Sequence, residues 1–209
     1  MPLSFTSGIF SSMDDLAGLS LPVKIAAGQK KQRYGRGSFD EDLLITHKGL
    51  SGPAVLQASS FWQEGEPLEV EWINEGQWQA LSEAPESRTK PAEVLLAQLM
   101  PTKLAKEFVS QVNLTGRKWA EISNKDKQQL IDLLCHWAVK PAGTLGWNKA
   151  EVMLGGVDTQ ALDGKSLMAK NHPGLFFIGE CVDVTGHLGG HNFQWAWSSG
   201  FACANALLD

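Results

Sequence analysis

Four consecutive apolar residues, Leu175 to Ile178, stand immediately before Gly179 and Glu180. Continuous apolarity without polar alternation is typical of a strand buried on both faces, as in a parallel sheet. A loop follows, and the pattern predicts a final helix from Asn192 to about Leu207 with its small residues on one face. This end of the chain therefore predicts a strand–loop–helix unit whose helix lies close against a sheet or a flat ligand.

The predicted unit carries the features of a ligand site. Ligands of open α/β sheets bind beyond the carboxyl ends of the strands, where Gly179 and Glu180 stand. Gly189-Gly190 lets the backbone approach a ligand closely. The free amides and the positive dipole end of the helix beginning near Asn192 favour an acceptor oxygen. The alternative is a glycine turn that caps a core helix, with Glu180 as a solvated acid.

The rest of the chain predicts strand-rich flanks around a helical block. Strands are expected at 21–27, 42–46, 67–73 and 150–154, the last one running into a glycine turn. Helices are expected at 54–61, 92–100 and 104–112, and from Ser123 or Asn124 to before Pro141. The polar stretch 74–91 is expected to be a loop. The tryptophans Trp119, Trp137 and Trp147 are expected to be core residues.

Composition limits the function classes. Lys and Arg number 18 against 23 Asp and Glu, a net charge of −5, which argues against broad electrostatic binding of nucleic acid. Three cysteines without CxxC spacing fit a reducing cytoplasm rather than a disulfide framework. No signal peptide is recognisable, and the stretch 188–208 is too polar to span a bilayer. We expect a cytoplasmic protein without nucleic-acid or membrane partners.

Two long signatures carry a family resemblance. One reads PGLFFIGE from Pro173, with Asp183 and Gly186, then GGHN from Gly189 and AWSSG from Ala196. The other reads THKGLSGPAVL from Thr46. Together with the turn Gly155-Gly156-Val157 they resemble the BaiN-like NAD(P)/FAD-dependent oxidoreductases, within the glutathione-reductase-like FAD fold. His191 stands where that family usually has Tyr.

The resemblance implies an FAD site and an electron donor such as NAD(P)H. The flavin-binding residues implied are Gly179, Glu180, Asp183, Gly189, Gly190, His191 and Asn192. The N1 and O2 edge of an isoalloxazine ring would face the helix N-terminus, and ribityl hydroxyls would donate to Glu180. Substrate-side candidates are His47, a proton carrier near neutral pH, and Ser51. Alternatively, His47 and Ser51 only form a turn and a helix cap.

The G-x-G-x-x-G fingerprint that holds a dinucleotide pyrophosphate does not occur in the sequence. Because family members run to about twice this length, the resemblance implies the C-terminal half of such a flavoprotein, with Met1 a non-native start. The fold class expected is α+β, with a strand-rich, barrel-like insert, a helical subdomain and a C-terminal strand–helix unit of an incomplete FAD-binding domain. The boundaries expected are 1–5 for the exit from the FAD domain, 6–90 strand-rich, 91–140 helical, 141–156 return strands and 157–209 FAD domain.

Two functions remain open at this point. The chain is either part of an FAD-dependent oxidoreductase acting on a small molecule, or a non-catalytic binding fragment that does not hold FAD alone. The terminal segment should have one apolar face without a partner, so that it either forms a homodimer or packs back on the insert. No metal site is expected, because Gly189 and Gly190 lie between His187 and His191 and prevent a helix from presenting both.

Overall fold

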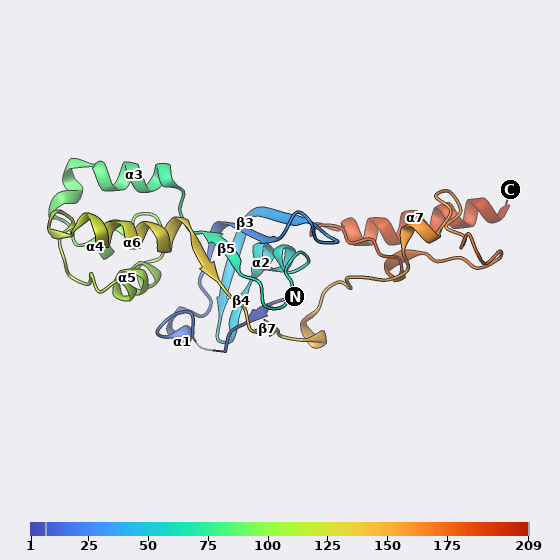
Figure 1. Ribbon diagram of the computed structural model, residues 1–209, viewed down its shortest axis with the longest axis horizontal. Coiled ribbons are helices and arrows are strands. Elements are labelled where there is room, and N and C mark those ends of the chain that lie inside the picture. Colours follow the sequence, from blue (N-terminus) through green and yellow to red (C-terminus); the bar gives the residue numbers. More distant parts are fainter. Residues whose placement is uncertain (7, 209) are drawn as a thin grey trace. The chain divides into compact units, whose positions relative to one another are not determined.

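The computed structural model describes residues 1–6 and 8–208 and divides the chain after Gly146 into two compact units (Figure 1). The first unit contains a seven-stranded sheet in which all strand pairs are antiparallel. In pairing order the strands are β6 (Trp137–Val139), β5 (Leu68–Glu71), β2 (Ser20–Gly28), β3 (Arg36–Thr46), β4 (Gly49–Ser51), β1 (Leu3–Ser4) and β7 (Gly143–Thr144).

Helices of the first unit lie on the sheet and form a separate helical block (Figure 1). They are α1 (Met13–Leu16), α2 (Gly52–Ala58), α3 (Glu75–Glu83), α4 (Ala92–Leu96), α5 (Thr102–Gln111) and α6 (Asn124–Cys135), with 3-10 turns η1 (Pro85–Thr89) and η2 (Trp119–Glu121). Helix α2 packs on β2 and β3. Its first residue, Gly52, has φ +86°, and a Cβ there would lie 2.7 Å from the carbonyl oxygen of Asp42. Only glycine permits this close start against the strand.

An aromatic cluster joins the sheet to the helical block. Phe108 of α5 is fully buried, and its ring centroid lies 5.9 Å from that of Phe10 and 5.4 Å from that of Trp72. Trp137 of β6 stacks on Phe10 at 5.6 Å. Such ring pairs each contribute about 0.5–1.5 kcal/mol beyond area burial. The cluster therefore fixes the helical block to the end of the sheet.

Glu107 of α5 fastens the N-terminal loop to the same block. Its side chain is 8% exposed. The Ser11 amide donates to Oε1 at 2.6 Å, the Ser11 hydroxyl donates to Oε2, and Gln111 Nε2 donates to Oε1 at 3.0 Å. Burial raises the pKa of this carboxyl, but these hydrogen bonds outweigh burial and hold the pKa below its ordinary value.

The structure corrects three expectations in the first unit. The stretch 74–91 is not a loop, because α3 and η1 form within it. Asn74 accepts from the Gln77 amide while the Gln77 side chain accepts from the Asn74 amide, a capping box that starts α3. The strand expected at 42–46 is also longer, since β3 begins at Arg36. The predicted α6 start after Ser123 is confirmed, with the Ser123 side chain capping the helix. The helix was expected to continue to before Pro141, but it ends at Cys135, because the next residues pair with β5 as strand β6.

The second unit is built from 3-10 turns, isolated bridges and one long helix. Its elements are η3 (Trp147–Lys149), η4 (Thr159–Ala161), η5 (Gly179–Cys181) and α7 (His191–Leu208). Its small core holds Leu162, Ala169 and Val182, with Phe177 and Trp195 packed against them. Helix α7 confirms the predicted final helix, which begins one residue earlier than expected.

Two predicted strands do not form in the second unit. Residues 150–154 are irregular, and the run 175–178 makes only an isolated antiparallel bridge from Phe176 to Met168. Leu175 and Ile178 are 45% and 43% exposed, so the run is not buried on both faces. The run pairs on one side only, through hydrogen bonds from the Ala169 amide to the Leu175 carbonyl and from the Phe177 amide to the Leu167 carbonyl, and this pairing is too short to form a ladder. Trp147, at 76% exposed, is also not the core residue expected.

The expected fold class is confirmed at the level of a mixed fold, with a strand-rich portion and a helical block. Among residues 1–6 and 8–208, no helix combines the length and apolarity that crossing a bilayer requires. The expected domain boundaries stay predictions.

Candidate functional site

Gly179 is held firmly against α7. Its amide donates to the buried Ser199 hydroxyl at 2.9 Å, and its carbonyl accepts from Trp195 Nε1 at 2.9 Å. Gly179 has φ +67°, and a Cβ there would meet Ala196 only at ordinary contact distance. The conformation, rather than crowding, therefore favours glycine at this point. Glu180 follows directly and is exposed.

A short parallel bridge positions the residues after Glu180. The Val157 amide donates to the Cys181 carbonyl, and the Asp183 amide donates to the Val157 carbonyl, both at 2.9 Å. Gly156, just before, has φ +139°, and a Cβ there would lie 2.5 Å from the Cys181 carbonyl oxygen. The glycine turn recognised in the sequence is thus needed for this close approach. Asp183 is half-buried and makes further contacts.

Asn192 closes the loop that runs from Gly186 to the start of α7. Its Oδ1 accepts from the Gly186 amide at 2.7 Å, and its Nδ2 donates to the Gly186 carbonyl at 3.1 Å. Gly189 and Gly190 lie inside this loop with φ of +105° and +92°, and a Cβ at either would meet nothing within 4 Å. The loop is therefore shaped by glycine conformations and fastened at its base by one side chain.

The residues predicted to bind flavin thus come together in one unit. Glu180, Gly189, Gly190 and His191 are exposed, while Gly179, Asp183 and Asn192 are half-buried. The exposed glycines leave open space beside the N-terminal amides of α7, an 18-residue helix. Such amides and the helix dipole suit an acceptor edge that gains negative charge. These residues fit one edge of a flavin ring, with the Asn192 side chain serving the loop rather than the ring.

Helix α7 also presents an apolar surface. Phe193, Trp197 and Phe201 follow at spacing i, i+4 and i+8 and are 72–79% exposed. Leu207 and Leu208 continue the exposed apolar surface at the end of the helix. An apolar stripe of this size is expected to be covered by protein or ligand.

His47 and Ser51 belong to the first unit. His47 lies at the tip of the β3–β4 hairpin, with its Nδ1 2.8 Å from Oδ1 of Asp14, and both side chains are exposed. A cavity of about 400 Å³ adjoins it, lined by Ser4, Phe5, Gly8, Ile9, Met13, His47, Lys48 and Leu145. Ser51 lies at the other end of β4 in the N-cap position of α2, but its side chain makes no capping hydrogen bond.

Sequence reasoning missed two groups that build these sites. Asp14 orients His47 but lies 33 residues away in sequence, and no local pattern signals the pair. Trp195 was not singled out, although its indole braces Gly179. Among residues 1–6 and 8–208, no group of three or more His, Cys, Asp or Glu is placed to hold a metal ion.

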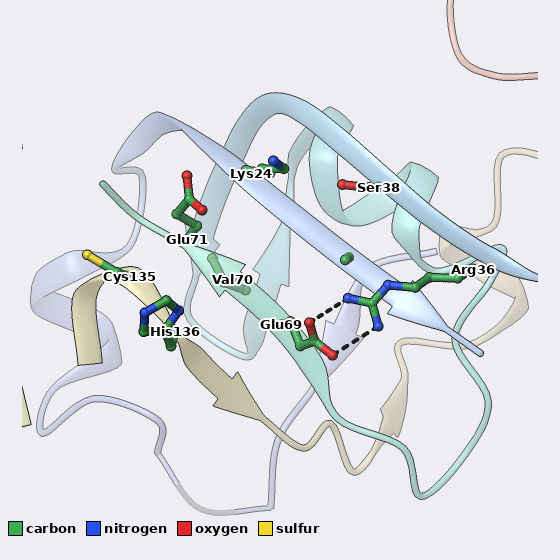
Figure 2. A pocket seen from close by; sticks show the side chains of 9 residues that line it. Lys24, Arg36, Ser38, Glu69, Val70, Glu71, Cys135 and His136 are labelled. Carbon is green, nitrogen blue, oxygen red and sulfur yellow. Dashed lines mark hydrogen bonds and ion pairs between the residues drawn. The ribbon is translucent and has the colours of Figure 1, made fainter. Parts of the chain in front are cut away.

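A second pocket lies on the sheet (Figure 2). Arg36 of β3 reaches over β2 to Glu69 of β5, with Nη1 3.0 Å from Oε1. The hydrogen bond from Arg36 lowers the pKa of Glu69, although burial opposes it. Cys135 at the end of α6 lines the same pocket. Burial, followed by the charges of nearby carboxylates, raises its pKa to about 11, so this thiol is a poor nucleophile.

The part of the chain that matches a known family is close to the first unit of the structure. The family model described as the HI0933-like protein barrel and H2TH domain matches residues 2–152. The chain belongs to the HI0933-like family. The barrel and helical parts of that description correspond to the sheet and the helical block of the first unit.

Curated relatives of the chain include two proteins of one name and a more distant reductase. The ribosomal RNA dihydrouridine synthase of Haemophilus influenzae is 43% identical over 194 residues, covering 92% of this chain and 47% of that protein. The protein of the same name from Escherichia coli K12 is 39% identical over 212 residues, which cover 100% of this chain and 51% of that protein. The 3-dehydro-bile acid delta(4,6)-reductase of Clostridium scindens is 26% identical over 216 residues, which cover 92% of this chain and 50% of that protein.

The chain spans about half the length of the curated relatives that it matches. The expected BaiN-like resemblance is confirmed only as membership of the HI0933-like family. The reductase among the relatives is a distant match, at 26% identity.

Proposed function

We propose that this chain supplies the flavin-ring site and the substrate side of an FAD-dependent reductase that acts on uridine in ribosomal RNA. The observation that carries the cofactor assignment is the exposed Gly189-Gly190 turn that opens beside the N-terminus of α7. The substrate class rests on two relatives of 43% and 39% identity, each named a ribosomal RNA dihydrouridine synthase.

The reaction adds two hydrogens across the C5–C6 double bond of uracil. FAD in its reduced form would supply the hydride, with NAD(P)H as the candidate electron donor. Within this chain, Gly189 and Gly190 would allow the ring to approach, and the first amides of α7 would stabilise negative charge at its acceptor edge. Glu180 would accept hydrogen bonds from the ribityl hydroxyls. Gly179, Asp183 and His191 shape the surrounding surface, and Asn192 keeps the loop in place.

His47 is the proposed proton carrier on the substrate side. Asp14 at 2.8 Å orients its ring, and histidine is the side chain suited to carrying a proton near neutral pH. Ser51 is the proposed hydrogen-bonding group for the uracil, because its hydroxyl makes no helix cap. Replacing His47 with Gln should lower turnover by about 100-fold or more if it transfers a proton.

The net charge of −5 predicts no broad electrostatic binding of nucleic acid, and a specific RNA substrate needs only a local site. A cytoplasmic location stays a prediction. A second candidate is a binding role without catalysis, favoured by the exposed apolar side chains Phe193, Trp197 and Phe201 of α7. In that role α7 would attach the chain to another protein surface, including a second copy.

Mass spectrometry of nucleosides from ribosomal RNA tests the proposal. A strain lacking the gene should contain less dihydrouridine in its ribosomal RNA than the parent, and the natural gene should restore it. A gene carrying the His47→Gln change should not restore it, whereas Lys106→Gln, an exposed control on α5, should. Unchanged dihydrouridine in the deleted strain would contradict the assigned substrate and favour the binding role.

A further inference from the structure

The β2–β3 hairpin ends in a basic loop, residues 29–35, within a chain that is acidic overall. Lys30, Lys31 and Arg33 are all exposed, and the loop contains no carboxylate. Figure 1 shows β2 and β3 as a long blue hairpin. A local excess of three positive charges on an acidic protein is the pattern of a confined anion-binding surface rather than of general polyanion affinity.

The loop is braced. Gly28 enters it with φ +80°, and a Cβ there would lie 2.4 Å from the carbonyl oxygen of Gly35. The Gln32 amide donates to the Gln29 carbonyl, and the Gly35 amide donates to the Gln32 carbonyl, both at 3.0 Å. Two successive turns therefore fix the backbone that carries the three cations.

The carboxylate of Glu66 is held by glutamines of the loop. Oε1 of Glu66 accepts from Gln29 Nε2 at 2.8 Å and from Gln32 Nε2 at 2.5 Å. These two glutamines tie the loop to the turn before β5 through Oε1 of Glu66, whose Oε2 is buried without a hydrogen-bond partner among the described residues. Glu64 on the same turn is exposed, and Glu69 pairs with Arg36. Lys30 and Lys31 at the loop tip are exposed and can face an external anion.

An aromatic ring lies among the cations. The guanidinium of Arg33 lies over the Tyr34 ring, 5.5 Å from its centroid. A planar cation stacked on an aromatic ring matches single-stranded nucleic acid, in which phosphates alternate with bases that stack on flat groups. Acidic peptides and lipid surfaces provide charge without such stacking partners.

We propose that the loop 29–35 binds the phosphate backbone of the RNA substrate. This inference rests on the proposed function, since it is the RNA class of substrate that supplies the phosphates. At 0.1 M monovalent salt, release of counterions makes each contact with a single-stranded phosphate worth about fivefold in affinity. Loss of three contacts should therefore weaken binding by about 100-fold.

The test compares two triple variants of equal charge. One is Lys30→Gln/Lys31→Gln/Arg33→Gln, and the control is Lys106→Gln/Lys118→Gln/Lys125→Gln, which removes three exposed cations from the helical block. The probe is a fluorescein-labelled oligouridylate of about 20 nucleotides, long enough to cover one single-strand site, followed by fluorescence anisotropy between 0.05 and 0.3 M KCl, about the range over which such binding changes steeply.

The loop variant should lose about 100-fold in affinity, and the slope of log K against log salt should fall by about two. The control should change less than about threefold, and Lys30→Arg/Lys31→Arg, which keeps the charges, should bind as the unaltered chain does. Equal losses in both triple variants, or a loss below about tenfold in the loop variant, overturn the proposal.

Two further outcomes separate this inference from the function it rests on. If the unaltered chain does not bind the probe, the loop proposal fails, while the dihydrouridine measurement decides the function independently. If the chain binds vesicles containing phosphatidylserine with the same loop dependence as RNA, the loop is a general anion site and the RNA assignment fails.

Discussion

Replacing Asn192 with Ala should open the loop beside the N-terminus of α7. The change removes two hydrogen bonds to Gly186, of 2.7 Å and 3.1 Å. Each is worth about 0.5–1.5 kcal/mol net, so that local opening should become easier by about 1–3 kcal/mol. The Gly186 amide, whose partner is lost, should then exchange its proton about 5- to 150-fold faster, because exchange reports the free energy of local opening.

Hydrogen exchange followed by NMR measures this directly. The matched control is Asn205→Ala, an exposed asparagine on the same helix, which should leave Gly186 exchange unchanged. Core amides of the first unit should exchange at the same rate in both variants. Unchanged protection of Gly186 in Asn192→Ala, or an equal effect of the control, would refute the assignment of Asn192 as the fastening of the loop.

Three further outcomes concern stability. Phe108→Ala should lower the free energy of unfolding by about 3–5 kcal/mol in urea titrations, with Phe108→Leu losing less; equal losses would contradict a packing role. Hydrogen bonds from Ser11 hold the folded pKa of Glu107 below 4.5 despite its burial. The native protein should therefore exceed Glu107→Gln in free energy of unfolding by an amount that is constant above about pH 5 and shrinks as the pH falls further; a difference independent of pH would contradict this role of Glu107. Gly156→Ala, whose Cβ would lie 2.5 Å from the Cys181 carbonyl oxygen, should increase proteolysis of the second unit, and unchanged proteolysis would show that the bridge tolerates a side chain.

The sequence predicted elements wherever a local pattern decides them. Helix α6 follows from its apolar spacing and from Ser123 as cap, and α7 follows from its run without charged residues. Helix α3 was not predicted from the sequence. It buries mainly Trp78 and is otherwise polar, so its hydrophobic periodicity is weak. Its capping box, Asn74 with Gln77, was readable in the sequence and would have identified the helix start.

The run 175–178 shows why other expectations failed. Its apolar side chains favour burial, but strand formation depends on pairing partners that the local sequence does not specify. Leu175 and Ile178 consequently stay exposed in the described structure. The candidate site follows the same rule. Glycines with positive φ could be expected from the sequence, whereas the Asn192–Gly186 closure and the His47–Asp14 pair depend on folding.

The visible absorption spectrum of the natural gene product that contains this chain tests the central claim most directly. We expect flavin bands and release of FAD on denaturation. Gly190→Val, which places a β-branched residue at φ +92°, should remove the bound flavin, whereas Gly116→Val, at φ +75° in the first unit, should not. A protein that stays colourless with added FAD, or a Gly190→Val variant with full flavin content, would contradict the account.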